Sequence, residues 1–139
     1  HVAYMYNWAD KPWKTQERIH QIVTTMYLNK PDGLCGNDDC GQMSAWYIFS
    51  SLGFYPVCPG SGQYAIGAPS VKEGKLQLKD GKILTVKANN LTDKNIYIQS
   101  VKLNGKPVNT TILTNAEINK GGELVFEMGG KPNKKWGVK

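Results

Sequence analysis

Residues 36–47 read Gly-Asn-Asp-Asp-Cys-Gly-Gln-Met-Ser-Ala-Trp-Tyr, and this stretch decides how the first part of the chain is interpreted. Two adjacent carboxylates, Asp38 and Asp39, stand between Gly36 and Gly41, and an apolar helical pattern follows them. Single carboxylates are common on solvated surfaces, whereas a pair held by a tight turn against a helix suits acid–base chemistry or a cation. The stretch therefore predicts a functional loop at the start of a buried helix.

The spacing of the acidic pair leaves three interpretations open. With Asp39 as the N-cap, Gln42 falls three residues later, which predicts a capping box. A carboxylate at a helix N-terminus meets the positive end of the helix dipole, so the pKa of Asp39 is expected to fall, which suits a base that deprotonates water. Asn37 and Asp38 offer oxygen ligands to a hard cation such as Ca²⁺, although the EF-hand spacing is absent.

Helical periodicity surrounds this loop. A helix is predicted from Lys11 to Leu28, with Asp10 as its N-cap and Pro12 in its first turn. A second helix is predicted from about Gly41 to Leu52, and apolar residues occupy most of its faces. Two helices cannot bury each other so completely, and we therefore expect the first part of the chain to belong to a larger helical domain.

Composition changes near residue 60, and the remainder predicts short strands. Alternating apolar residues place strands at 76–78, 83–86, 96–103 and 124–126. Asp80-Gly81 and Asn104-Gly105 are expected to form hairpin turns, because such pairs accept positive φ. The predicted class is α+β, with helical residues 1–60 and a β-rich region 61–139 that forms a small antiparallel sheet or half of a sandwich.

Charge and length exclude two classes of partner. The net charge is +6, and thirteen lysines against six acidic residues lie in 71–139. Arginine is absent there and no aromatic residues interleave with the lysines, so a solvated β surface is expected and a nucleic-acid partner is not. No apolar run reaches the roughly 20 residues of a membrane-spanning helix.

The chain begins at His1 without an initiator methionine, so we expect a piece of a longer protein whose export signal lies outside it. It contains three cysteines, Cys35, Cys40 and Cys58. An odd count excludes a fully paired disulfide framework, while a Cys35–Cys40 bridge and buried free thiols both remain open.

The run from Gly33 to Tyr47, followed by Ser51-Leu52-Gly53-Phe54-Tyr55-Pro56, resembles the α-mannosidases of glycoside hydrolase family 92. Four further stretches are similar to the same family in order and spacing: His1–Asn7, Lys11–Gln16, Tyr64–Pro69 and Leu103–Lys106. The resemblance therefore covers essentially the whole chain.

This resemblance implies an exo-acting, inverting, Ca²⁺-dependent α-mannosidase that hydrolyses terminal, often α-1,2-linked, mannose from glycans. It implies that residues 1–60 are the last helices of an (α/α)₆ catalytic barrel and that 61–139 are the β-rich C-terminal region. By motif position Asp39 matches the general base, and Asp38 stands beside it as a supporting carboxylate. The general acid is an upstream glutamate that nothing in this chain matches.

The resemblance carries further expectations about ligands. His1 lies in a family segment whose preceding residues bind sugar and calcium, so it is either a contact to mannose or a structural histidine beside the barrel wall. Some members carry Asp where Asn37 stands. Most calcium ligands would lie outside the chain, in the missing N-terminal remainder of the parent protein. The parent would be secreted, periplasmic or on the surface of a bacterium, and the isolated chain would be inactive.

Two functions of other classes compete with this one. A non-catalytic carbohydrate-binding module would display aromatic platforms on its strands, and the β-rich region offers only Tyr64, Tyr97, Phe126 and Trp136 for that role. A structural module without a ligand is the second alternative.

Overall fold

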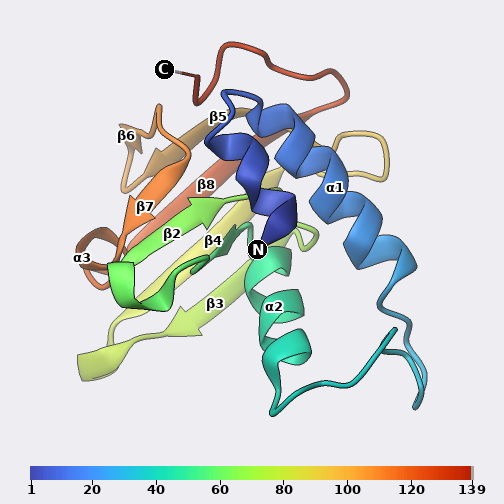
Figure 1. Ribbon diagram of the computed structural model, residues 1–139. Coiled ribbons are helices and arrows are strands. Elements are labelled where there is room, and N and C mark those ends of the chain that lie inside the picture. The colour runs from blue at the N-terminus through green and yellow to red at the C-terminus, as the bar shows by residue number, and fades with distance from the viewer. Residues whose placement is uncertain (139) are drawn as a thin grey trace.

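The computed structural model describes residues 1–138, and its first part is helical, as the periodicity predicts. A 3₁₀ helix η1 (Val2–Asn7) precedes two α-helices, α1 (Pro12–Thr25) and α2 (Gln42–Ser51) (Figure 1). Proline suits the first turn of α1, where its missing N–H has no intrahelical acceptor. The N-cap of α1 is Lys11 without a side-chain hydrogen bond, so the prediction of Asp10 as the cap is wrong. Asp10 instead adopts a φ of 53°, outside the extended conformation that a capping residue takes.

Two sheets follow α2. The smaller has the order β1 (Phe54–Tyr55), β2 (Gln63–Ile66), β7 (Ile112–Thr114). The larger has the order β3 (Glu73–Gln77), β4 (Ile83–Asn89), β8 (Gly122–Gly129), β5 (Tyr97–Leu103), β6 (Lys106–Pro107). The remaining elements are two 3₁₀ turns, η2 (Pro59–Ser61) and η3 (Lys79–Gly81), and a short helix α3 (Asn115–Ile118).

One pair of strands departs from the predicted antiparallel arrangement. β4 and β8 are parallel, whereas the other paired strands are antiparallel. β5 runs antiparallel to β4 but is not its neighbour, and β8 fills the space between them. A strand inserted between two antiparallel strands must be parallel to one of them. The predicted turns at Asp80-Gly81 and Asn104-Gly105 are confirmed, since all four residues have φ between 50° and 78°.

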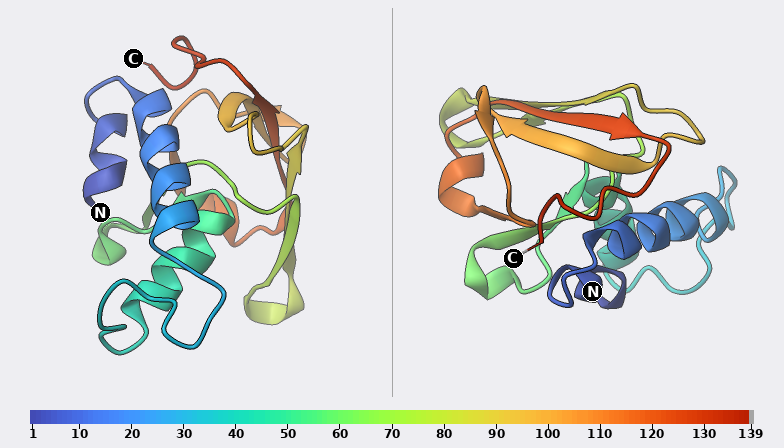
Figure 2. Two further views of the ribbon diagram at one scale, coloured as in Figure 1. Left: turned by 90° about the vertical axis from the view of Figure 1, so that its right-hand side faces the viewer. Right: turned by 90° about the horizontal axis from the view of Figure 1, so that it is seen from above.

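The helices lie on one face of the larger sheet, and the smaller sheet lies beside them on the same face (Figure 2). A large core cluster joins both sheets to the C-terminal end of α2, and its fully buried members include Phe54, Leu84, Leu113 and Phe126. A second cluster forms where η1, α1 and α2 meet β2, and contains Tyr4, Ile19, Val23, Trp46 and Ala65. The α+β class is confirmed.

Buried hydrogen bonds attach the helices to the strands. The Asn7 side-chain amide donates to the carbonyl of Ile66 at 2.8 Å, and the Ile98 N–H donates to the side-chain oxygen of Gln16 at 3.0 Å. β1, before residue 60, pairs with β2, after it. The β-rich region therefore fixes the position of the helices and of the loop between α1 and α2.

All three cysteines are free and exposed, so neither a Cys35–Cys40 bridge nor buried thiols are found. Within residues 1–138, no helix has the length and apolar character required to cross a membrane.

Candidate active site

The loop between α1 and α2 starts as a small hairpin. Tyr27 and Leu34 form an isolated antiparallel bridge, and the Leu28 N–H donates to the carbonyl of Gly33 at 2.9 Å. Gly33 is buried, and a Cβ at this position would collide with the carbonyl oxygen of Leu28. Glycine is therefore required for the chain to close here. The hairpin fixes the start of the loop that carries the acidic pair.

Three consecutive residues in the left-handed conformation lead from the acidic pair into α2. The φ angles are 49° for Asp39, 60° for Cys40 and 86° for Gly41. Left-handed backbone is disfavoured for residues with a side chain, and such strain is concentrated at functional sites. The turn is closed by hydrogen bonds from the Gln42 N–H to the Asp39 carbonyl at 3.3 Å and from the Met43 N–H to the Asp38 carbonyl at 3.2 Å.

This turn corrects the predicted capping box. The N-cap of α2 is Gly41, which makes no side-chain cap, so Asp39 does not cap the helix. Asp39 is exposed. Within residues 1–138, its carboxylate makes no hydrogen bond or ion pair. The left-handed turn moves the N-cap two residues past Asp39, to Gly41, and local spacing did not reveal this.

Asp38 takes the place that was predicted for Asp39. One oxygen of its carboxylate accepts the backbone N–H of Ser44 at 2.9 Å, and the other accepts the Ser44 hydroxyl at 2.9 Å. The backbone bond first, and the hydroxyl bond next, lower the pKa of Asp38 below its ordinary value. The carboxylate that the start of the helix stabilises in its ionised form is thus Asp38.

Tyr27 connects the hairpin to the start of α2. Its hydroxyl donates to the carbonyl of Met43 at 3.1 Å, and its ring stacks on Trp46 at 5.8 Å between centroids. Burial raises the pKa of Tyr27, and the nearby charges of Cys35 and Asp38 add to the effect. Tyr27 therefore stays a neutral donor and holds the first turn of α2 against the loop.

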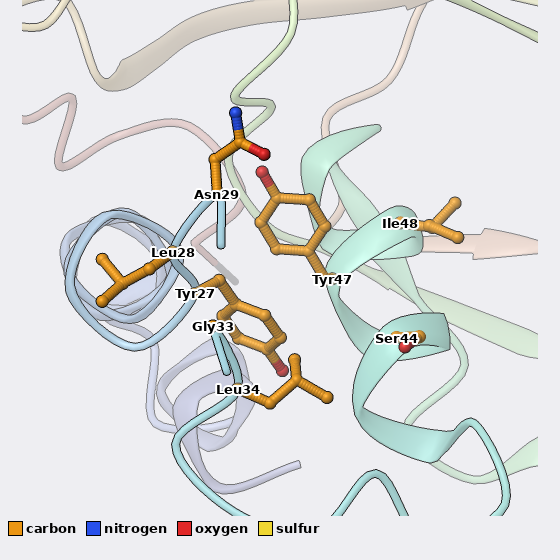
Figure 3. A pocket seen from close by; sticks show the side chains of 8 residues that line it. All are labelled: Tyr27, Leu28, Asn29, Gly33, Leu34, Ser44, Tyr47 and Ile48. Carbon is orange, nitrogen blue, oxygen red and sulfur yellow. The ribbon is translucent and has the colours of Figure 1, made fainter. Parts of the chain in front are cut away.

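A pocket of about 400 Å³ lies beside the acidic loop, between the hairpin and α2 (Figure 3). The pocket is lined by Tyr27, Leu28, Asn29, Gly33, Leu34, Ser44, Tyr47 and Ile48, and most of this lining is apolar. Tyr47 is 39% exposed and Ile48 is 57% exposed. One side of α2 thus carries apolar side chains that residues 1–138 leave partly uncovered.

The other predicted site residues do not gather at the loop. Asn37 is exposed on it, next to Asp38. His1 is exposed and lies at the level of the C-terminal end of α2, whereas the acidic loop lies at the N-terminal end (Figures 1 and 2). The described part of the chain thus brings Asp38 and Asp39 together but leaves His1 apart from them.

The donor set of the loop does not fit a calcium site by itself. Ca²⁺ takes six to eight oxygen ligands, and residues 1–138 contain no group of three or more His, Cys, Asp or Glu side chains placed to hold a metal. Both oxygens of Asp38 already accept hydrogen bonds from Ser44. The loop by itself therefore does not complete a metal site.

Two residues of the site were missed by the sequence analysis. These are Ser44 and Tyr27, neither of which was singled out as a site residue. The contact between Asp38 and Ser44 could be anticipated, because an Asp lies six residues before a Ser in the first helical turn. This inference requires knowing where the helix begins. Nothing in the sequence signals the hydrogen bond of Tyr27.

Comparisons with known proteins agree on one family. The family model described as the glycosyl hydrolase family 92 catalytic domain matches residues 1–130. A family GH92 α-mannosidase of Bacteroides thetaiotaomicron is 47% identical, with a TM-score of 0.96 over 100% of this chain and 19% of that one. It has also been solved in complex with mannoimidazole.

Two further relatives extend the comparison. A family GH92 inverting mannosidase of the same organism is 41% identical, with a TM-score of 0.93 over 100% of this chain and 19% of that one. A protein of Arthroderma benhamiae described as an uncharacterized secreted glycosidase is 30% identical over 99% of this chain and 18% of its own length. The chain thus spans about a fifth of the length of these relatives.

Proposed function

Since the chain belongs to glycosyl hydrolase family 92, we propose that it is part of an exo-acting α-mannosidase and that it supplies the general base of an inverting reaction. The observation that carries this assignment is the contrast within the acidic pair. Asp38 is engaged through both oxygens, while Asp39 is exposed on a strained turn beside it. A carboxylate without internal partners is free to accept a proton from water.

Inversion requires two carboxyl groups, one acting as a general acid and the other as a general base. One protonates the leaving oxygen, and the other activates a water molecule on the opposite face of the sugar, at a separation of roughly 6.5–9.5 Å. Asp38 does not suit the acid, because Ser44 holds it ionised. By the family resemblance the acid is a glutamate outside this chain, and the isolated chain is inactive because single members of a catalytic unit contribute little alone.

The uncovered side of α2 supports placing this chain in an (α/α)₆ barrel. Apolar helices are stable in a soluble protein only when neighbours cover them. Here Tyr47 and Ile48 remain exposed, and the relatives are about five times as long. Neighbouring helices of the parent protein would fill the pocket beside the loop.

The remaining parts of the proposal rest on the family resemblance. The substrate is a glycan with terminal α-linked mannose, with the α-1,2 linkage preferred, as in the trimming of N-glycans. Calcium would be held chiefly by residues outside this chain, with Asn37 or Asp38 as additional oxygen donors and His1 as a candidate sugar contact. The parent protein would be exported from a bacterial cell.

A non-catalytic carbohydrate-binding module is the weaker alternative. Its aromatic platforms would have to be exposed, but Phe126 is 0% and Trp136 6% exposed, and Tyr64 and Tyr97 are half-buried. The Trp136 indole also donates to the carbonyl of Val108 at 2.9 Å. These side chains serve packing in the structure.

The test is an Asp39→Asn variant of the full-length parent enzyme, with Asp32→Asn on the same loop as the matched control. Asp39→Asn should lower the release of mannose from an α-mannobioside by at least about a thousandfold while the melting temperature stays within a few degrees. NMR of the first-formed sugar in the native enzyme should show the β-anomer. Retained activity in Asp39→Asn, or the α-anomer as first product, would refute the proposal.

A further inference from the structure

We propose that Ser44 is a positioning residue for Asp39, and that it acts by holding the Asp38 carboxylate. This inference rests on the proposed role of Asp39 as the general base. It goes beyond that role because it assigns a function to a residue that acts through its neighbour Asp38.

In the described part of the chain, the Asp39 carboxylate has no support from other side chains. It is exposed, and among residues 1–138 it has no hydrogen-bond partner. The direction of its side chain is therefore set by the backbone of residues 38–41. A base must stand within about 3 Å of the proton that it takes, so this backbone has to be held firmly.

The backbone of residues 38–41 is in a conformation that is unfavourable without other contacts. Asp39 and Cys40 both have positive φ although they carry side chains. Left-handed residues with a side chain are energetically costly and persist only where surrounding contacts impose them. The two backbone bonds that close the turn measure 3.2 and 3.3 Å, at or beyond the long end of the ordinary range.

The contact between Ser44 and Asp38 imposes this turn. Ser44 binds both oxygens of Asp38, each at 2.9 Å, through a backbone N–H fixed in the first turn of α2 and through its own hydroxyl. Hydrogen bonds to a charged group are shorter and stronger than those between neutral groups. They connect the residue before Asp39 to a rigid helix on the other side of the strained turn. Loss of the hydroxyl releases one of the two anchors.

The experiment uses the full-length parent enzyme with an α-mannobioside as substrate. Ser44→Ala should lower kcat by about 10- to 100-fold, since a displacement of about 1 Å costs on that order, while KM changes less than about twofold. Ser44→Thr retains the hydroxyl and should restore kcat to within about threefold of the native value. Thr114→Ala removes a comparable cap of α3, remote from the loop, and should leave kcat unchanged.

A second variant keeps the inference testable if Ser44→Ala folds poorly. Cys40→Gly relieves the left-handed strain and opens no cavity, because Cys40 is exposed. It should keep or raise the melting temperature and yet lower kcat at least about fivefold, because the turn is then held less firmly. If the turn at residues 38–41 had only a structural role, Cys40→Gly would raise the melting temperature without changing kcat.

The outcomes separate this inference from the proposed function. Activity retained in Asp39→Asn refutes the base assignment. An inactive Asp39→Asn enzyme together with native kcat in Ser44→Ala or Cys40→Gly overturns the positioning role alone. Equal loss in Ser44→Ala and Ser44→Thr also overturns it, because the hydroxyl would then not be the anchor.

Discussion

Replacement of Ile48 by glutamine tests whether the apolar side of α2 is covered in the parent protein. Ile48 is 57% exposed in this chain. Full burial of such a side chain is worth about 1.5–3 kcal/mol, so about 1–2 kcal/mol remains to be gained when a neighbouring helix covers the exposed part. Burial of the amide of glutamine would cost about a further 1–3 kcal/mol without a partner.

The expected result therefore differs between the two proteins. In the 139-residue chain, Ile48→Gln should change the free energy of unfolding by no more than about 0.5 kcal/mol, as for an ordinary surface substitution. In the parent enzyme it should destabilise the helical domain by at least about 2 kcal/mol. Denaturation in urea measures the first, and calorimetry together with denaturation of the parent measures the second.

A matched control is Ile83→Gln, because Ile83 is 50% exposed and lies on β4, away from α2. Ile83→Gln should change the free energy of unfolding of the 139-residue chain by only a small amount. A similar small change for Ile48→Gln in the chain and in the parent would show that no helix covers this side, and the argument for the barrel would lose its structural support.

Two further predictions concern the β-rich region. Phe126→Ala removes a ring that is 0% exposed in the core between the two sheets, and should lower the free energy of unfolding by about 3–5 kcal/mol in urea denaturation; a loss below 1 kcal/mol would contradict that packing. Glu117 accepts hydrogen bonds from the backbone and the hydroxyl of Thr114, which lower its pKa from the ordinary 4.5. Because the folded-state pKa is the lower one, this stabilisation is present above about pH 4.5 and is lost as the pH falls through the lowered value. The stability difference between native protein and Glu117→Gln should therefore shrink below pH 4.5, and a difference that stays constant down to pH 3 would count against the assignment.

Local features of the fold were predictable because their causes are local. The 3–4 spacing of apolar residues located α1 and α2, although α1 ends at Thr25 rather than Leu28. Asx-Gly pairs marked two turns, because few other residue pairs accept positive φ twice in succession. The prediction that α2 lacks covering partners agrees with the exposure of Ile48. Strands β1, β2, β6 and β7 were missed, since strands of two to four residues show too few alternations to be detected.

The sequence by itself determined the α+β class, the position of the acidic pair at the start of a helix, and the family resemblance that the comparisons confirm. Only the tertiary structure decided which carboxylate the helix holds. Three left-handed residues displace the helix start to Gln42, so that Asp38 is bound to Ser44 and Asp39 is left exposed. The order of the strands was decided in the same way, because the place of β8 between β4 and β5 depends on contacts between residues far apart in the chain. Spacing along a sequence reports local conformation, whereas hydrogen-bond partners across a turn or a sheet are set by the three-dimensional path of the backbone.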